Sequence, residues 1–198
     1  MRMDAFALTG NIAGGKSAVG RILSRYPDVV VFNCDKIGKE IIASEPLRQA
    51  VRIAVGFDAY PHGQADFPAI ALKIFSDRRA KENLEQLIHP LVWREVRRLV
   101  ASSPASIKIV ESAIVFEMNV RHYFKAVITA ACPLHERYRR LKEDRGMTSD
   151  GIAARMHEQM DDGVKEKLAD IVIRTDCDIR QLEWRVAALY HTLQSWQK

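Results

Sequence analysis

The 198-residue sequence has few cysteines and no long apolar segment. Its three cysteines, Cys34, Cys132 and Cys177, lie far apart and form no C-x-x-C pair, which excludes a disulfide framework and a cysteine-rich zinc site. The six histidines are scattered, without the spacing of metal ligands. No apolar run approaches the length that spans a bilayer, and the first residues enter a predicted strand directly, without the pattern of a signal peptide. We therefore expect a cytoplasmic protein with no membrane partner.

The charge balance favours anionic partners without choosing among them. The net charge is +5, and hydrophobic residues make up 47% of the chain, enough for a sizeable core. The arginine groups near Arg94 and Arg137 alternate with acids, which is typical of a solvated helix face. They also lack the interleaved aromatic residues of a base-stacking surface. We therefore expect no nucleic-acid partner.

The segment "GNIAGGKS", residues 10–17, follows the first apolar run and fits the pattern G-x-x-x-x-G-K-S. Glycine lets successive backbone N–H groups turn toward an anion, and the helix predicted from Lys16 points its positive dipole end at the same place. Lys16 would reach the outer phosphates of ATP, and the Ser17 hydroxyl would ligate Mg²⁺. A glycine-rich turn without function is the alternative, but the strand before and the helix after favour phosphate binding. The expected nucleotide-binding residues are Asn11, Ile12, Ala13, Gly14, Gly15, Lys16, Ser17 and Ala18.

Five short apolar runs without polar alternation predict a parallel sheet that helices cover on both faces. They are residues 4–9, 28–32, 106–110, 124–130 and 170–173. The interval between the second and third runs is too long for one crossover helix and is mostly helical in pattern. Its expected helices are 36–43, 46–55, 68–75, 78–88 and 90–100.

This layout predicts an α/β, three-layer P-loop NTPase fold with a five-stranded parallel sheet, a helical acceptor-binding insert and a helical lid, which is typical of small-molecule kinases. We expect a single P-loop kinase domain over residues 1–198. Its core would comprise about 1–43, 104–132 and 169–198, with the insert at about 44–103 and the lid at about 133–168.

Two carboxylates follow predicted strands at the sheet edge that carries the P-loop. Asp35 comes just after the second strand and is the candidate base that accepts the proton of a hydroxyl acceptor. An N-cap for the helix near Lys36 is an equally good interpretation of Asp35. Glu111 ends the third strand, where a carboxylate can orient the water ligands of Mg²⁺.

An ordered set of motifs resembles the dephospho-CoA kinase family over nearly the whole chain. Beyond the P-loop and "NCD", the matching positions are His89-Pro90, Phe116-Glu117, Arg140, Gln159 and Ala169-Asp170. The resemblance implies ATP-dependent phosphorylation of the ribose 3′-hydroxyl of dephospho-CoA to give CoA, in the last step of its biosynthesis. Dephospho-CoA is then the expected partner, and the protein is expected to be a monomer or small homo-oligomer.

The resemblance also implies roles for individual residues. Catalysis would fall to Asp35, Lys16 and Arg140, the last from the lid. The substrate-binding residues would be Asp35, Lys39, His89 and Glu117. Two assignments have structural alternatives: His89 could mark a helix boundary before Pro90, and Arg140 could form a surface ion pair with Asp144.

Several positions depart from the family pattern. Asn11 and Ala13 stand where glycine is usual, and because alanine tolerates left-handed backbone poorly, Gly14 is expected to carry more of the turn. The other departures are Asn33 for an aspartate, Phe67 for an arginine, Thr175 for an asparagine, and Asp144-Arg145 for an Arg-Asp pair. They affect the expected acceptor affinity more than the chemistry.

Two other functions fit the same core. One is another small-molecule or nucleoside kinase, against which the insert and the His89-Pro90 pair argue. The other is a non-catalytic P-loop module that binds ATP as a switch. The combination of Asp35 with Lys16 and Ser17 argues against that second function.

Overall fold

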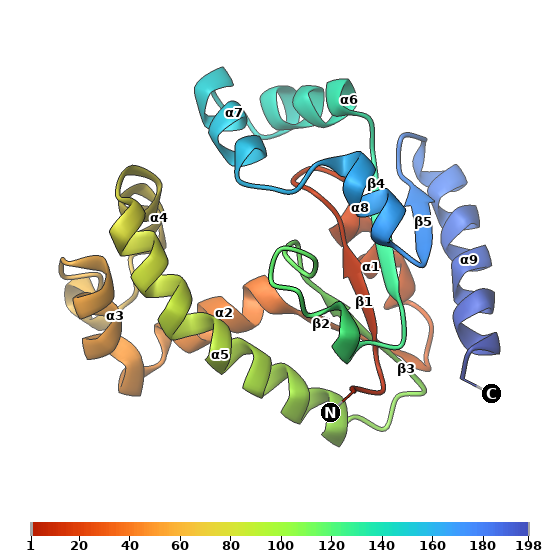
Figure 1. The fold of residues 1–198 in the computed structure, drawn as a ribbon, viewed down its shortest axis with the longest axis horizontal. Helices are drawn as coiled ribbons and strands as arrows, with labels where there is room; N and C mark the ends of the chain where they lie inside the picture. The colour runs from red at the N-terminus through yellow and green to blue at the C-terminus, as the bar shows by residue number, and fades with distance from the viewer. Residues whose placement is uncertain (1, 198) are drawn as a thin grey trace. The chain divides into compact units, whose positions relative to one another are not determined.

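The computed structural model describes residues 2–197 and contains all five predicted strands. They are β1 (Phe6–Thr9), β2 (Val29–Asn33), β3 (Ile107–Glu111), β4 (Val127–Ala131) and β5 (Ile171–Arg174). They form one sheet in the order β2-β3-β1-β4-β5, in which β1 pairs in parallel with β3 and β4, and β4 with β5 (Figure 1). The prediction of an α/β fold on a five-stranded parallel sheet is confirmed.

Both faces of the central strands are buried, which explains their unbroken apolar sequences. Phe6 and Leu8 of β1 point toward α1 (Lys16–Leu23) and α9 (Ile179–Ser195), which pack against each other and share one core cluster with them. Ala7, between them, faces the other side and is also fully buried. Since β1 lies at the centre of the sheet, the loop after it emerges in the middle of the carboxyl edge.

The chain folds as two compact units. The first comprises the chain up to Phe32 together with the chain from Val100 onward, and the second comprises Asn33–Leu99. The first unit therefore holds the P-loop and the predicted lid. The second unit holds the helical segment predicted between the second and third strands.

Four helices begin in the second unit: α2 (Cys34–Ala43), α3 (Arg48–Val55), α4 (Phe67–Ser76) and α5 (Arg78–Ser102). Short 3₁₀ turns lie at Glu45–Leu47 and Pro61–Gly63. The helices expected at 78–88 and 90–100 are in fact the single helix α5, with Pro90 inside it. Proline removes one helical hydrogen bond, but Ile88, Val92 and Val96 on either side are buried at four-residue spacing and hold the helix together. The helix-boundary interpretation of His89 is therefore wrong.

The predicted lid consists of three helical segments in the first unit. The helix α6 (Leu134–Arg139) continues directly into the π-helical segment η4 (Arg140–Asp144), and α7 (Ser149–His157) and α8 (Asp162–Leu168) follow. One further 3₁₀ turn covers Arg121–Tyr123. None of the helices within residues 2–197 is both long and apolar enough to cross a membrane.

Candidate active site

The loop between β1 and α1 is shaped by glycines that have no room for a side chain. A Cβ atom on Gly10 (φ 145°) would lie 2.4 Å from the carbonyl oxygen of Ala130. A Cβ atom on Gly15 (φ 87°) would lie 2.6 Å from the hydroxyl of Thr175. Both positions also adopt backbone that favours glycine. The loop is thus packed tightly against the ends of β4 and β5.

The left-handed backbone of the loop lies at Ala13 and Gly15, so the expectation that Gly14 carries more of the turn is wrong. Ala13 has φ 57°, and Gly14 is not among the residues with positive φ. Gly14 is required for space instead, because a Cβ there would lie 2.8 Å from the carbonyl oxygen of Asn11. The strained turn at Ala13 costs roughly 1–2 kcal/mol, and a hydrogen bond from Arg140 Nη1 to the Ala13 carbonyl (3.2 Å) offsets part of that cost.

Backbone donors at the start of α1 remain free for an anion. Within residues 2–197, the N–H groups of Gly15, Lys16 and Ser17 have no hydrogen-bond acceptor, and no side chain caps α1. These donors lie at the positive end of the helix dipole. Lys16 adds an ammonium group that forms no ion pair with a described residue. The arrangement fits the phosphates of a nucleotide.

Ser17 and Glu111 lie together beside these donors. The Ser17 hydroxyl donates to Glu111 Oε1 at 2.7 Å, and Glu111 is buried where β3 ends next to β1. A hydroxyl beside a carboxylate fits Mg²⁺, which prefers oxygen ligands and keeps several waters. No cluster of three His, Cys, Asp or Glu side chains in residues 2–197 could hold a metal ion alone, so a magnesium ion here would take its remaining ligands from nucleotide and water.

Arg140 contacts the P-loop rather than Asp144. Its guanidinium donates to the carbonyl oxygens of Ala13 (3.2 Å) and Thr175 (2.7 Å), and its carboxylate partner is Glu136, at 3.1 Å. The predicted surface ion pair with Asp144 is absent from the described residues. The helix widens into π geometry at Arg140, so Asp144, four residues later, no longer lies one turn above Arg140.

Glu136 pairs with two arginines of the next helical turn, Arg139 and Arg140. Hydrogen bonds from Arg139 and then from Arg140 lower the pKa of the Glu136 carboxyl to about 2. The carboxylate is therefore ionised at neutral pH and keeps both guanidinium groups close to the helix. The carboxylate of Asp144 stays exposed to solvent.

Asp35 lies in the first turn of α2, in the second unit, and does not cap that helix. The cap is Asn33, whose side-chain oxygen accepts from the Lys36 N–H at 2.9 Å. The capping interpretation of Asp35 is therefore wrong, and the asparagine noted as a departure has a structural role that its strong N-cap preference could have indicated. The Asp35 carboxylate is exposed, and no described residue binds it.

Two other candidates for substrate binding also lie in the second unit. Lys39 is exposed on α2, with its ammonium 5.9 Å from the ring centre of Phe67. His89 lies in the middle of α5 and is partly buried. Burial lowers the pKa of His89 below its ordinary value of 6.5, opposed by the charge of Glu85. The imidazole is therefore neutral at pH 7.

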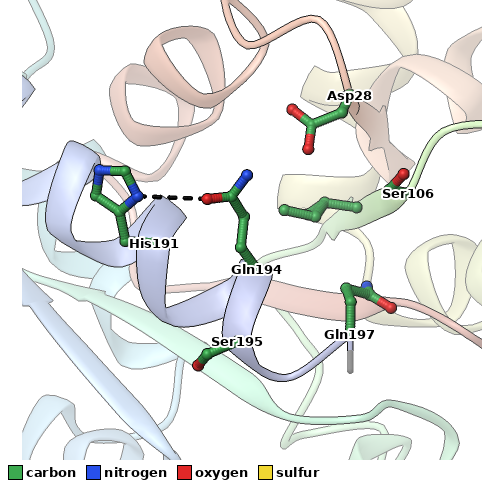
Figure 2. Close-up of a pocket in the computed structure, with 7 residues that line it drawn as sticks. Asp28, Ser106, His191, Gln194, Ser195 and Gln197 are labelled. Carbon is green, nitrogen blue, oxygen red and sulfur yellow. Dashed lines mark hydrogen bonds between the residues drawn. The ribbon is translucent and has the colours of Figure 1, made fainter.

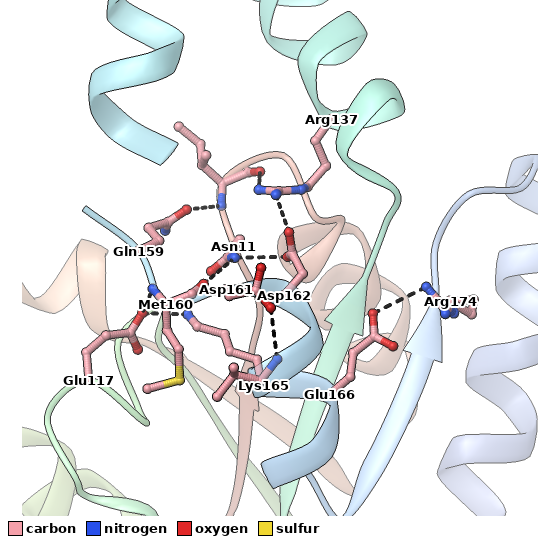
Figure 3. Close-up of polar contacts among 12 residues, drawn as sticks. Asn11, Glu117, Arg137, Gln159, Met160, Asp161, Asp162, Lys165, Glu166 and Arg174 are labelled. Atoms are coloured by element: carbon pink, nitrogen blue, oxygen red, sulfur yellow. Dashed lines mark hydrogen bonds and ion pairs between the residues drawn. The ribbon is translucent and has the colours of Figure 1, made fainter. Parts of the chain in front are cut away.

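Glu117, the fourth candidate for substrate binding, lies in the first unit and is held by α8. Its Oε1 accepts from Lys165 Nζ at 2.7 Å and from the Met160 N–H at 3.1 Å (Figure 3). Lys165 is 1% exposed and also donates to the Ala113 carbonyl at 2.8 Å. Burial lowers the pKa of Lys165, opposed mainly by its hydrogen bond to Glu117. Nothing in the local sequence marks this lysine as buried, because Asp162, Glu166 and Lys167 of the same short helix are charged as well.

A second polar group surrounds the P-loop, and the sequence analysis did not predict its contacts. Gln159 Oε1 accepts from the Ile12 N–H at 2.8 Å, so that donor is unavailable to a phosphate (Figure 3). Arg137, which was assigned with its neighbours to a solvated face, is 3% exposed and pairs with Asp162. Its burial depends on α6 and α8 lying together beside the P-loop, which the local sequence of either helix does not reveal.

A cavity of about 480 Å³ lies in the first unit at the opposite, amino-terminal edge of the sheet. Its lining residues are Asp28, Ser106, Ile107, His191, Gln194, Ser195 and Gln197 (Figure 2). Asp28 is its only carboxylate, and neither lysine nor arginine lines it. This cavity therefore lacks the cationic groups that phosphates require.

Comparison with known proteins gives one consistent result. The family model described as Dephospho-CoA kinase matches residues 5–181. The Dephospho-CoA kinase of Moorella thermoacetica is 30% identical over 200 residues, covering 97% of this chain and 93% of that protein. The one of Methylococcus capsulatus is 29% identical over 190 residues, covering 95% and 96%.

Solved structures agree on the fold. A crystal structure from Thermus thermophilus is 26% identical, with a TM-score of 0.81 over 98% of this chain and 99% of that one. Dephospho-CoA kinase from Campylobacter jejuni is 19% identical, with a TM-score of 0.65 over 96% and 97%. Shikimate kinase from Acinetobacter baumannii, at 14% identity and a TM-score of 0.56 over 95% and 93%, extends the likeness to a further P-loop kinase.

Proposed function

Since the chain belongs to the dephospho-CoA kinase family, whose members are transferases of coenzyme A biosynthesis, we propose that it transfers the γ-phosphoryl group of ATP to the ribose 3′-hydroxyl of dephospho-CoA. The observation that carries this proposal is the set of free N–H donors at Gly15, Lys16 and Ser17, at the positive end of α1. Phosphoryl transfer depends mostly on positioning and charge neutralisation, and these groups supply both.

We assign the loop residues 11–18 to the nucleotide, in two roles. The N–H groups from Gly15 to Ser17 and the Lys16 ammonium would contact the phosphates directly. The earlier positions of the loop contribute its shape, because Ile12 already donates to Gln159 and the Asn11 amide is already engaged by residues of the lid.

Arg140 would neutralise negative charge on the phosphates during transfer, and Ser17 and Glu111 would hold a magnesium ion that does the same. Three of the five N–H groups of Arg140 are used by Glu136, Ala13 and Thr175, which leaves two for a phosphate oxygen. Ser17 would ligate Mg²⁺, and Glu111 would orient its water ligands. When bound, the ion would screen the phosphate charges and so ease the approach of an electron-rich hydroxyl oxygen.

Asp35 is the proposed base for the acceptor hydroxyl. Its support is the resemblance of the "NCD" segment to the family motif, together with an exposed carboxylate that neither caps α2 nor binds a described residue. A carboxylate left free in this way can accept the proton that the hydroxyl loses as the O–P bond forms.

The second unit is the proposed site of the rest of the acceptor. A cavity of about 400 Å³ between α2 and α5 has apolar walls that include Ile37, Ile41 and Leu91, and its charged lining residues are Glu40, Arg94 and Glu95. The apolar walls fit a largely uncharged arm. Lys39 and His89 of this unit, and Glu117 of the first unit, remain the proposed polar contacts of the acceptor.

The decisive experiment measures ADP release, by a coupled assay, with dephospho-CoA, adenosine and common nucleosides as alternative acceptors. We expect ADP formation to depend on dephospho-CoA, with phosphate appearing on the ribose 3′-oxygen of the product. Faster reaction with a nucleoside would favour another kinase of this fold. ATP binding without ADP formation on every acceptor would favour a non-catalytic module.

Action in the cytoplasm, as a monomer or small homo-oligomer, is part of the same proposal. Its support is that no disulfide links Cys34, Cys132 and Cys177. Sedimentation of the purified chain would give the oligomeric state directly.

A further inference from the structure

A buried polar bridge joins the P-loop to the amino end of α8. Asn11, which is 4% exposed, donates from Nδ2 to the Met160 carbonyl and to Asp162 Oδ1, each at 2.9 Å (Figure 3). One amide group thus engages two acceptors on the same short segment. This fixes the position of Asp162 relative to the loop.

The second oxygen of Asp162 reaches the lid helix. Asp162 Oδ2 forms an ion pair with Arg137, the buried arginine of α6. Arg137 Nη1 also lies 3.3 Å from the Ile12 carbonyl oxygen. Among residues 2–197, Asp162 is the only carboxylate that pairs with Arg137. Because an unpaired buried guanidinium is strongly unfavourable, this pair resists any movement that separates α6 from α8.

The same helix carries Arg140, three residues after Arg137 and therefore on the same side. The two arginines contact successive carbonyl groups of the P-loop, Arg137 that of Ile12 and Arg140 that of Ala13. A shift of the helix that moved Arg140 away from the loop would also pull Arg137 from Asp162. The position of the partly buried Arg140 is thus tied to that of the buried Arg137.

We propose that Asp162 is a positioning residue, which fastens the lid helix to the P-loop through Arg137 and Asn11 and so holds Arg140 at a fixed place beside the nucleotide phosphates. The inference rests on the proposed function insofar as Arg140 acts on those phosphates. Asp162 touches neither ATP nor acceptor in this role. Its effect on the reaction passes entirely through Arg140.

A double-mutant cycle between Asp162→Asn and Arg140→Ala tests this dependence. Asn keeps the size of Asp162 and its acceptor for Asn11 but removes the charge opposite Arg137. We expect Asp162→Asn to lower kcat/KM for ATP about tenfold to a hundredfold, since a small misplacement of a catalytic group has effects of this size. In the Arg140→Ala background, the same substitution should change kcat/KM by less than about twofold.

A purely structural role gives a different pattern. Asp162→Asn would then lower the melting temperature in both backgrounds and lower kcat/KM by the same factor in both, and that result would overturn the proposal. Asn11→Ala is the second variant, because it breaks the bridge at the loop without leaving an unpaired buried charge. Asn11→Ala should likewise lower kcat/KM for ATP in the wild-type background and change it by less than about twofold in the Arg140→Ala background.

Glu166→Gln is the matched control on the same helix. Glu166 pairs at 3.3 Å with the exposed Arg174 and does not contact the P-loop (Figure 3). Its loss should leave kcat/KM within about twofold of wild type. The affinity for a fluorescent ATP analogue is measured for every member of the cycle and should follow the same pattern. Absence of dephospho-CoA-dependent ADP formation by the wild type would refute the proposed function, whereas additive effects on ATP affinity would refute the role of Asp162.

Discussion

Side chains around the P-loop divide into those that hold the loop and those that remain free for a ligand. Gln159 accepts through Oε1 from the Ile12 N–H and Asn11 donates through Nδ2 to Met160 and Asp162, whereas Lys16 has no ion pair among the described residues. A free charge contributes little to the folded state, so its removal can reduce activity without unfolding the protein. Because the charges of Lys16 and Asp35 have no partner among the described residues, a substitution at either position tests its role in the reaction with little effect on folding.

We expect Lys16→Ala to lower kcat by at least about a hundredfold, because the ammonium stabilises charge that grows as the phosphoryl group leaves. The melting temperature should change little. Lys167→Ala, on the exposed side of α8, is the control for loss of one positive charge and should have near-normal kcat. Wild-type turnover by a folded Lys16→Ala protein would contradict the assignment of the P-loop.

We expect Asp35→Asn to lower phosphoryl transfer to dephospho-CoA by about two orders of magnitude or more, because the amide cannot accept a proton. ATP affinity should persist, since the substitution lies outside the P-loop. Thermal stability should also persist, because Asn33 and not Asp35 caps α2. Single-turnover rates and ATP affinity, measured on one preparation, check the loss of transfer and the persistence of ATP binding. Near-normal transfer would mean that another group is the base.

At the scale of elements, the lid helix is notable for its change of geometry at Arg140. The α-helical part places Arg137 in the interior, against the Ile12 carbonyl, and Arg139 outside, and the π-helical part begins at Arg140, which contacts the Ala13 carbonyl. π-helical turns are often found at functional sites. The segment therefore brings two arginines to the P-loop, the buried Arg137 and the partly buried Arg140.

We expect Arg140→Ala to lower kcat/KM for ATP by about a hundredfold, because the group acts where closure excludes water. Loss of its bonds to Ala13 and Thr175 should also cost about 1–3 kcal/mol of unfolding free energy. Arg139→Ala is the control, since among the described residues that arginine pairs only with Glu136 and Glu143 of its own helical segment, and its loss should change the unfolding free energy little. Equal kinetic effects for the two variants would remove Arg140 from the site.

At the scale of the whole molecule, the chain divides its chemistry between two units. The first unit supplies the sheet, the proposed phosphate site, the predicted lid and Glu117, and the second supplies Asp35 and the other proposed acceptor contacts, Lys39 and His89. Each unit has its own buried side chains, as Phe6 in the first and Val51 in the second illustrate. Stability of the whole chain therefore responds to titratable groups in either unit.

We expect the free energy of unfolding to fall as the pH drops below about 6.5, partly because of His89. Burial lowers the pKa of His89 in the folded state, so below pH 6.5 the unfolded chain binds a proton that the folded chain does not. His89→Asn should flatten this slope, measured by urea unfolding between about pH 7 and 5. Identical slopes for the two proteins would contradict the expectation.

Glu136 does not interfere in this window. Its lowered pKa adds stability that is complete above its ordinary pKa of 4.5 and is lost only as the pH falls toward about 2.

The sequence by itself determined the parts of this protein that depend on neighbouring residues. The five strands are recognisable because burial on both faces requires continuous apolar runs, and the P-loop because its phosphate-binding donors come from consecutive backbone groups. The cap at Asn33 also depends on local sequence alone, because asparagine is among the preferred N-cap residues and its partner Lys36 lies three residues ahead. Glu111 follows from its strand end alone, and the structure places it against Ser17.

Only the tertiary structure decided which polar residues are buried and what they contact. Arg137, Asp162 and Lys165 look like solvated helix residues in sequence, yet each forms an ion pair with a residue far along the chain or on another element. The burial of a charge depends on where helices pack, which the periodicity of a short helix does not specify. The unbroken course of α5 through Pro90 and the left-handed turn at Ala13 have the same origin. In each, contacts from distant segments outweigh the local preference of the residue.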